Sequence, residues 1–265
     1  MVDGAVFEDF FVVFCALLGL LLGSFANVII YRLPQGKSIV SPRSACPQCG
    51  KPVSWYDNIP VLSWLILRGK CRHCCKAISI RYPLVELLMG FLFFAVAYRF
   101  GMTWTTLEYL ILMFGLVTVS FIDMDHMILP DSFTLSGVVI GLVGAALSPE
   151  REFMSALYGV LLGGGFLWAV AYFYFALRNQ EGMGGGDIKL LAWLGAVLSW
   201  TSVPFIILSS SVIGSVAGLI MALFKDSKLK TTIPFGPYLA LGAILYIFVG
   251  DELTNWYLDL FIPNR

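Results

Sequence analysis

The segment Glu181–Leu191 reads EGMGGGDIKLL, so a run of glycines leads into one aspartate, Asp187, and an apolar stretch follows. Similar apolar stretches recur along the 265-residue chain, of which 58% is hydrophobic and 13% is charged, and the mean hydropathy is +0.84. Soluble domains of ordinary composition are less apolar than this. The chain is therefore predicted to be an integral membrane protein embedded in the lipid bilayer.

Eight apolar segments predict an all-α polytopic membrane protein with about eight transmembrane helices. Several of the segments are shorter than the roughly 20 residues that a membrane span normally needs. Asp3, Glu8 and Asp9 precede the first segment, where a secretory signal would be positively charged, so this segment is expected to be a retained span. The segments are Phe10–Ile30, Pro83–Tyr98, Leu107–Ile122, Phe133–Leu147, Phe153–Leu177, Ile188–Trp200, Val203–Phe224 and Tyr238–Val249.

The basic residues are distributed unevenly, although the net charge is zero. Nine of the 17 lysines and arginines lie between Arg32 and Arg81, where the only acid is Asp57. If that segment is cytosolic, alternation of the helices across the membrane puts 14 of the 17 on the cytosolic side. Positive residues favour that side, so the orientation is predicted, with Asp187 at the cytosolic face. No pattern indicates a nucleic-acid partner.

The polar segment 32–82 is predicted to be a cytosolic metal-binding module, inserted between the first two helices and similar to a zinc ribbon. It contains CPQC at Cys46–Cys49 and CRHCC at Cys71–Cys75, with 21 residues between the two C-x-x-C pairs. This spacing is close to that of a four-cysteine zinc ribbon. So short a segment cannot bury a core of its own, and a metal would supply the missing folding energy. The expected ligands of a structural Zn²⁺ are Cys46, Cys49, Cys71 and Cys74.

A disulfide pair and a redox-active C-x-x-C are the alternative interpretations, and a reducing cytosol argues against the disulfide. Cys75 and His73 could replace a ligand, although the regular spacing favours Cys74. Cys15, inside the first helix, is expected to be a small buried apolar residue. Four thiolates would leave the metal no open position, so the site should hold the module together and take no part in catalysis.

Acidic residues lie at the ends of two predicted helices. The run SFIDMDHMILPD, residues 120–131, ends one helix with three acids, and Asp187 begins another. Ionisable groups at membrane depth are costly unless they are paired or hydrated, so they point to function. Asp131 follows a proline and precedes an apolar run, which suits a helix N-cap. Asp125 and His126 suit an interfacial loop.

Only one of Asp123 and Asp125 can face Asp187, because two positions on a helix differ by about 200° of rotation. Asp123 directly follows the apolar run and is therefore the preferred partner. Two close carboxyl groups retain one proton and titrate as a unit. Aspartyl proteolysis requires this, since the ionised member takes a proton from water while the protonated member polarises the scissile carbonyl.

Three glycines precede Asp187, and they are the candidate substrate-binding residues. Without side chains they would let an extended substrate backbone approach the carboxylate, and they would permit backbone angles that other residues avoid. A phosphate-binding loop is a weak alternative, because no lysine followed by serine or threonine completes the motif. The glycines are Gly184, Gly185 and Gly186.

GGGD at Gly184–Asp187 resembles the G-x-G-D signature of intramembrane aspartyl proteases, which presenilin-like and prepilin peptidases share. The chain as a whole resembles the bacterial type IV prepilin peptidases along nearly its full length. Besides the four cysteines, the motifs that carry the resemblance are GSFANVIIYRLP (Gly23–Pro34), NIPVLSW (Asn58–Trp64), ISIRYPLVELL (Ile78–Leu88), IDMDHMILPD (Ile122–Asp131), GMGGGDIKLLAWLGA (Gly182–Ala196) and PFGPYLALGA (Pro234–Ala243).

This resemblance implies a multi-pass enzyme of the bacterial inner membrane with its active site and zinc module facing the cytosol. Such enzymes are prepilin peptidases that remove a short basic leader from type IV prepilins and type II secretion pseudopilins, cutting after a glycine. The catalytic aspartates of the family's D-x-D-H and G-x-G-D motifs match Asp123 and Asp187. Many members also N-methylate the new N-terminal residue, so S-adenosylmethionine is expected as a methyl donor from the resemblance alone.

The expected organisation is a first transmembrane helix over residues 1–31, the cysteine module over 32–82 and a transmembrane aspartyl peptidase core over 83–265. A membrane transporter or proton relay with paired carboxylates is the alternative function. The chain lacks a convincing internal repeat, which argues against a transporter. A presenilin-like protease would lack the cysteine module.

Further acids could meet a basic leader, namely Asp125, Asp131 and Glu181. Glu86 could bind the leader or an arginine, and a buried structural pairing is an equal alternative. The segment Trp256–Ile262 is expected to form an interfacial helix anchored by its aromatic residues.

Overall fold

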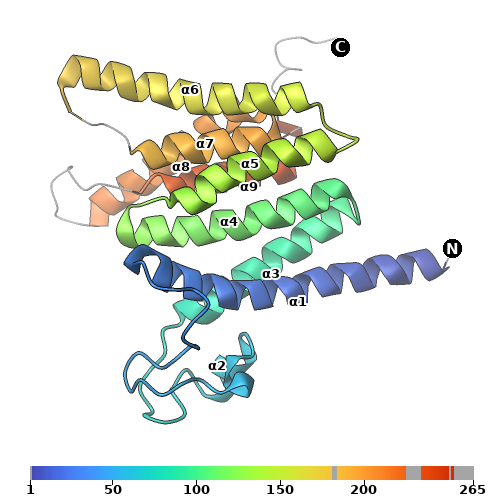
Figure 1. Ribbon diagram of the computed structural model, residues 1–265, viewed down its shortest axis with the longest axis vertical. Helices are drawn as coiled ribbons and strands as arrows, with labels where there is room; N and C mark the ends of the chain where they lie inside the picture. Colours follow the sequence, from blue (N-terminus) through green and yellow to red (C-terminus); the bar gives the residue numbers. More distant parts are fainter. Residues whose placement is uncertain (1, 181–183, 225–233, 251, 254–265) are drawn as a thin grey trace. The chain divides into compact units, whose positions relative to one another are not determined.

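The computed structural model describes residues 2–180, 184–224, 234–250 and 252–253, and these are helical apart from loops and two isolated β-bridges (Figure 1). The chain forms two compact units, Met1–Ile122 and Asp123–Arg265. Their boundary lies inside helix α4 (Trp104–His126), so the main part of α4 belongs to the first unit and its last turn to the second.

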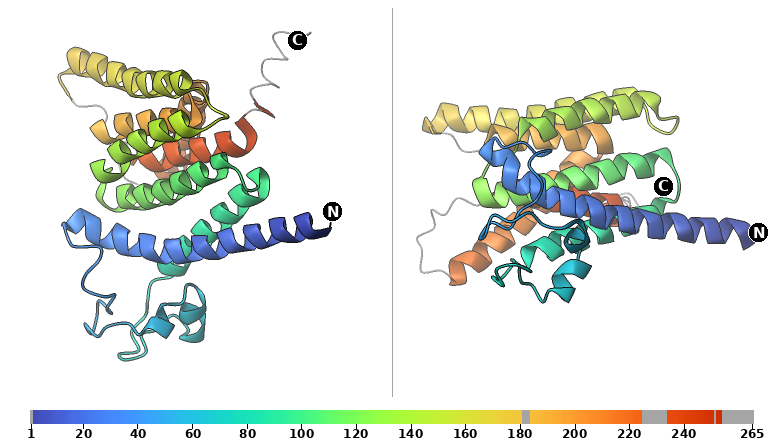
Figure 2. Two further views of the ribbon diagram at one scale, coloured as in Figure 1. Left: turned by 45° about the vertical axis from the view of Figure 1, so that its right-hand side comes forward. Right: turned by 60° about the horizontal axis from the view of Figure 1, so that its bottom comes forward.

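The first unit is built on the pairing of α1 (Val2–Arg32) with α3 (Arg81–Phe100), which cross in the views of Figure 2. Glycines of α1 bring the two backbones together. A Cβ atom added at Gly19 would lie 2.7 Å from the carbonyl oxygen of Met89, and one added at Gly23 would lie 2.7 Å from the Cα atom of Glu86. Small residues allow such close packing of membrane helices.

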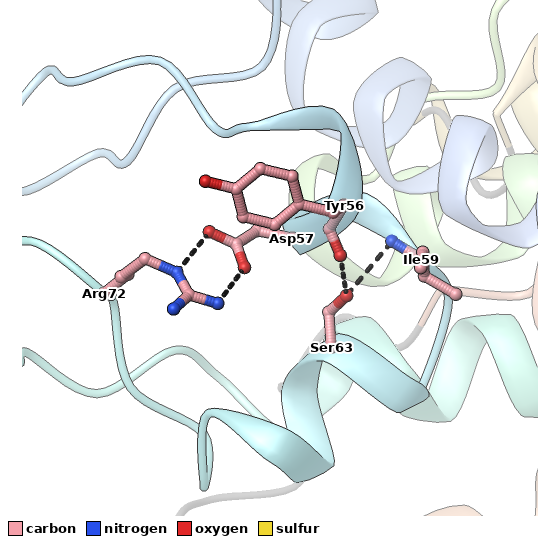
Figure 3. A network of polar contacts seen from close by, with 5 residues as sticks. All are labelled: Tyr56, Asp57, Ile59, Ser63 and Arg72. Atoms are coloured by element: carbon pink, nitrogen blue, oxygen red, sulfur yellow. Dashed lines mark hydrogen bonds and ion pairs between the residues drawn. The ribbon is translucent and has the colours of Figure 1, made fainter.

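The cysteine module (residues 32–82) follows α1 and contains the short helix α2 (Leu62–Ile66) with two 3₁₀ turns, Leu33–Gln35 and Trp55–Asn58. Figure 3 shows its polar network. The carboxylate of Asp57 accepts hydrogen bonds from Nε and Nη2 of Arg72 at 2.8 and 2.6 Å. These hydrogen bonds lower the pKa of Asp57. The hydroxyl of Ser63 donates to the carbonyl of Tyr56 at 2.9 Å and accepts from the N–H of Ile59 at 3.1 Å. These two hydrogen bonds stabilise the turn that precedes α2.

Glu86 of α3 connects the module to the helix pair. Its side chain is buried, and Oε2 accepts a 2.7 Å hydrogen bond from the backbone N–H of Val61. Val61 has a φ of 60°, which is unusual for a β-branched residue. Glu86 therefore makes a buried structural pairing, one of the two roles expected for it.

The two C-x-x-C sequences form hairpins with the same backbone pattern. In the first, the N–H of Cys46 donates to Lys51 O and the N–H of Gly50 donates to Cys46 O, both at 2.9 Å. In the second, the N–H of Cys71 donates to Lys76 O and the N–H of Cys75 donates to Cys71 O, also at 2.9 Å. Cys75 thus occupies the place of Gly50. Both have left-handed backbones, with φ of 56° and 69°.

Asp123–Arg265, the second unit, surrounds α7 (Gly185–Leu198) with four other helices. Residues 190–198 of α7 are all buried. Figure 1 shows α5 and α6 running beside α7, with α8 and α9 completing the unit. The surrounding helices are α5 (Asp131–Leu147), α6 (Phe153–Arg178), α8 (Ser202–Phe224) and α9 (Gly236–Leu245), and α9 continues as a π-helical turn over Tyr246–Gly250.

Glycines allow α7 to be enclosed so tightly. A Cβ atom at Gly159 of α6 would lie 2.0 Å from the carbonyl oxygen of Gly195, and one at Gly195 would lie 2.1 Å from the carbonyl oxygen of Gly159. Gly137 of α5 leaves room for the indole of Trp193, which a Cβ atom would meet at 2.3 Å. At the crossing of α6 and α7, therefore, neither Gly159 nor Gly195 can be replaced by a residue with a side chain unless the two helices move apart.

Arg151, in the turn between α5 and α6, satisfies carbonyl groups at the end of α7. Its guanidinium donates to Ala196 O at 3.2 Å, to Val197 O, and to Gly141 O of α5 at 3.1 Å. The last four carbonyl groups of a helix have no partner within the helix. One arginine thus stabilises the C-terminus of α7 and joins it to α5.

Each of the eight apolar segments contains a helix, but their lengths differ. Within the part of the chain that the structure describes, five helices are long and apolar enough to cross a membrane, namely α1, α3, α4, α6 and α8. The other three, α5, α7 and α9, have 17, 14 and 10 residues. At 1.5 Å per residue, α7 extends over about 21 Å, less than the roughly 30 Å of a hydrocarbon core.

Arg151→Met should lower the free energy of unfolding by about 1–3 kcal/mol, because buried carbonyl groups of α7 would lose their donor. Thermal unfolding in detergent, followed by circular dichroism, measures the effect. Arg178→Met, which removes an exposed arginine at the end of α6, is the control and should change stability little. Equal stability of the two variants would contradict the role given to Arg151.

Cys75→Gly should leave the metal content per chain unchanged and raise the stability of the module by about 1 kcal/mol, because glycine adopts a left-handed backbone without strain. Gly50→Ala, at the equivalent position of the first hairpin, should lower stability by a similar amount. Protease resistance of the module and metal content per chain measure both effects. Loss of metal in Cys75→Gly would show instead that Cys75 is a ligand.

Candidate functional site

Asp123 lies in the last turn of α4 with only 5% of its surface exposed. Its Oδ2 accepts a 3.0 Å hydrogen bond from the backbone N–H of Gly236, at the start of α9. Asp125, two positions further along, is exposed. The expectation that the two aspartates face opposite ways is therefore confirmed, and Asp123 is the one that faces the interior.

Asp187 lies in the first turn of α7 and is half-buried. Its backbone N–H donates to the carbonyl of Gly184 at 3.2 Å, which closes the turn that begins the helix. The residue before it, Gly186, packs against Leu129, whose side chain also lies beside Gly236, the donor to Asp123. The second unit thus brings the segments that carry the two predicted carboxylates close to one another.

Leu129, in the loop between α4 and α5, lies between the backbone that donates to Asp123 and the backbone that carries Asp187. A Cβ atom at Gly186 would meet Leu129 Cβ at 2.8 Å, and a Cβ atom at Gly236 would meet Leu129 Cδ2 at 3.1 Å. Neither Leu129 nor Gly236 was among the predicted site residues. The signal for Gly236 was the run PFGP, in which a proline after the glycine marks the start of a helix.

The three glycines before Asp187 have different surroundings. Gly184 and Gly185 are exposed, and an added Cβ atom at Gly185 would meet nothing within 4 Å. Gly186 is tightly packed against Leu129. The expectation of unusual backbone angles is wrong, because Gly184 is extended with φ of −70° and Gly185 and Gly186 begin an ordinary helix. Close packing against Leu129 explains the glycine at position 186, whereas the exposed Gly184 and Gly185 meet no such restriction.

Asp131 does not act as an N-cap, contrary to expectation. Pro130 occupies the N-cap position of α5, with no side-chain capping bond, and Asp131 is the first residue of the helix. Its carboxylate instead forms a 2.6 Å ion pair with Lys189 of α7. This pair connects the start of α5 to the first turns of α7. His126 is exposed at the end of α4, whereas Glu181 and the segment Trp256–Ile262 lie outside the described residues.

The second candidate centre is the cysteine cluster of the first unit. The Sγ atoms of the four predicted ligands lie within 4.8 Å of one another, and those of Cys46 and Cys74 are 3.9 Å apart. Tetrahedral coordination with Zn–S distances of 2.3 Å requires sulfur separations of about 3.8 Å. Backbone N–H groups of Cys49 and then Gln48 lower the pKa of Cys46 to about 6. The group could hold a metal ion, and Cys75 and His73 are not part of it.

All six cysteines are free, so the disulfide interpretation is not supported. Cys15 is buried in α1, as expected.

Known proteins resemble the chain along most of its length. The model of the bacterial peptidase A24 N-terminal domain matches residues 17–100, and that of the type IV leader peptidase family matches residues 110–219. A relative from Stutzerimonas stutzeri is 42% identical over 93% of this chain and 94% of its own length. A relative from Neisseria gonorrhoeae is 38% identical over 97% of this chain and 98% of its own.

Both relatives are named prepilin leader peptidase/N-methyltransferase, as is one from Pseudomonas aeruginosa that is 40% identical over 94% of each chain. No solved structure matches the chain. The matched segments include the C-x-x-C hairpins and both aspartates of the candidate site. By its sequence, and by the family models that cover it, the chain belongs to the type IV leader peptidase family.

Proposed function

We propose that the protein is a membrane-embedded aspartyl endopeptidase that cleaves the basic leader from type IV prepilins and type II secretion pseudopilins after a glycine. It then N-methylates the new N-terminal residue. The observation that carries the hydrolytic part is geometric: Asp123 accepts from the Gly236 N–H, and Leu129 packs against both Gly236 and Gly186, the residue before Asp187. The names of the relatives support both activities.

Hydrolysis would use the two carboxyl groups as a pair that shares one proton. Oδ2 of Asp123 accepts a hydrogen bond from the Gly236 N–H, which stabilises negative charge on that oxygen. The ionised member removes a proton from a water molecule, whose oxygen attacks the scissile carbonyl. The protonated member polarises that carbonyl. Collapse of the intermediate breaks the C–N bond and gives a carboxylate on the leader and an amine on the mature protein.

The exposed Gly184 and Gly185 would receive the extended backbone of the substrate beside Asp187. An added side chain at Gly185 would meet only open space, so the protein's own packing does not require glycine there. We infer that position 185 is a glycine because a side chain there would obstruct the backbone of the substrate. Gly186 would contribute indirectly, through its contact with Leu129.

S-adenosylmethionine would serve as the methyl donor, and its reactive methyl group would pass to the amine that hydrolysis releases. A cavity of about 1000 Å³ lies in the first unit, bordered by the cysteine module, α1 and α3. Its volume is at the upper end of the range for small-molecule sites. The lining includes two acids, Asp57 and Glu86, and the rings of Tyr31, Trp64 and Tyr82, and Asn27 and Trp64 would hold the donor. An indole ring suits its positive sulfonium group.

The cysteine cluster would bind one structural Zn²⁺. Four thiolates fill the tetrahedral coordination of zinc, so the metal would hold the two hairpins together and would not activate water. The short module contains few buried side chains, which makes metal binding the main source of its stability.

The proposed location is the bacterial inner membrane, with eight membrane-inserted helices and with the carboxylates and the cysteine module toward the cytosol. The distribution of lysine and arginine supports this orientation. The proposed organisation is a first helix over residues 1–31, a module over 32–82 and a peptidase core over 83–265. A prepilin would present its basic leader on the cytosolic side and its apolar helix to the bilayer, with the scissile bond at the interface.

Asp123→Asn and Asp187→Asn should each reduce cleavage of a synthetic prepilin on the order of 10³-fold or more, because neither variant retains an acid–base pair. The purified variants are incubated with the substrate, and mass spectrometry measures the released leader. Asp125→Asn, two positions from Asp123 and exposed, should retain kcat, with any effect confined to KM. Full processing by either active-site variant would overturn the peptidase assignment.

Removal of the metal should unfold the module and leave the transmembrane helices intact. Elemental analysis should find one zinc per chain, lost in Cys46→Ser and retained in Cys75→Ser. Limited proteolysis should cut within residues 33–80 only in the metal-free protein, while the helical circular dichroism signal stays the same. A metal-free protein that keeps a protease-resistant module but loses all hydrolysis would show that the metal is catalytic.

A further inference from the structure

The start of α9 reaches the buried carboxylate of Asp123 through the backbone of Gly236. The donor and acceptor are 113 residues apart in sequence, and their hydrogen bond is buried. A Cβ atom at Gly236 would lie 2.7 Å from Asp123 Oδ2 and 3.4 Å from its Cγ. Any residue other than glycine would therefore displace the carboxylate or the start of the helix.

Leu129 fixes the same region from another side. Its side chain touches Gly236 and its Cβ lies against Gly186, the residue before Asp187. A Cβ atom at Gly186 would overlap Leu129, and one at Gly236 would press on its Cδ2 atom. The leucine therefore sets the distance between the backbone that donates to Asp123 and the backbone that carries Asp187.

We propose that Gly236 and Leu129 are positioning residues for the reaction, with the Gly236 N–H orienting the Asp123 carboxylate and Leu129 setting its separation from Asp187. This inference rests on the proposed peptidase function. Neither residue touches the substrate in the proposed mechanism. Their effect should therefore appear in kcat, since a displacement of about 1 Å in a catalytic group can cost on the order of 10²-fold in rate.

Gly242 offers a matched control in the same helix. A Cβ atom there would meet Ser209 Oγ at 2.8 Å and Ile206 O at 3.0 Å, contacts as tight as those at Gly236. These neighbours belong to α8 and not to the carboxylate pair. Gly242→Ala therefore disturbs the packing of α9 to a similar degree without touching Asp123.

The experiment compares full-length Gly236→Ala, Gly242→Ala, Leu129→Ala, Leu129→Met and Asp123→Asn with the wild type, using a synthetic prepilin. Steady-state kinetics give kcat and KM, and thermal unfolding gives Tm. Gly236→Ala should lose about tenfold or more in kcat with KM nearly unchanged. Gly242→Ala should lower Tm to a similar extent and keep its kcat. Leu129→Ala should lower kcat, and Leu129→Met, of similar volume, should restore most of it.

Equal kcat losses in Gly236→Ala and Gly242→Ala, in proportion to their losses of Tm, would reduce Gly236 to a packing residue and overturn the inference. Wild-type kcat in folded Gly236→Ala would also overturn it. If Gly236→Ala fails to fold, the two Leu129 variants decide, and equal kcat in both refutes the positioning role. Cleavage by Asp123→Asn would instead refute the peptidase function itself.

Discussion

Backbone contact between α6 and α7 is the constraint on which the second unit depends. At Gly159 and Gly195 each helix lies so close to the other that a Cβ atom on either would overlap a carbonyl oxygen of its neighbour. Together with the contacts of the other surrounding helices, this approach buries residues 190–198 of α7. Because this part of α7 is buried, the orientation of the helix is fixed, and with it the position of Asp187 in the first turn.

The carboxylate pair is assembled around this helix from segments that are distant in sequence. Asp123 comes from the last turn of α4 and is held by the N–H of Gly236, while Leu129 contacts both Gly236 and Gly186. The ion pair of Asp131 with Lys189 adds a second connection between the start of α5 and α7. Every connection except the ion pair involves a glycine, so close backbone approach is the common device.

Local patterns in the sequence predicted those features that local geometry determines. Helical periodicity separates buried Asp123 from exposed Asp125, and the spacing of the C-x-x-C pairs brings four Sγ atoms together. The apolar segments mark the helices, although three of these helices are shorter than a membrane span.

Features that depend on contacts between residues far apart in the sequence could not be predicted from local patterns. The N-cap expected at Asp131 is wrong, because its carboxylate pairs with Lys189, 58 residues away. The role of Gly236 depends on a hydrogen bond across 113 residues, which no rule of sequence spacing describes. Gly186 was expected to admit a substrate backbone and to adopt unusual backbone angles, whereas the structure shows it in a helix and packed against Leu129.

Arg151 gives α7 an anchor at the end opposite Asp187, where it binds the terminal carbonyl groups. A sliding motion of α7 along its axis would have to break these hydrogen bonds, the ion pair at Lys189 and the glycine contacts with α6 together. Such a motion would cost far more than a rearrangement of a loop. The position of Asp187 along the axis of α7 is thus held from both ends of the helix.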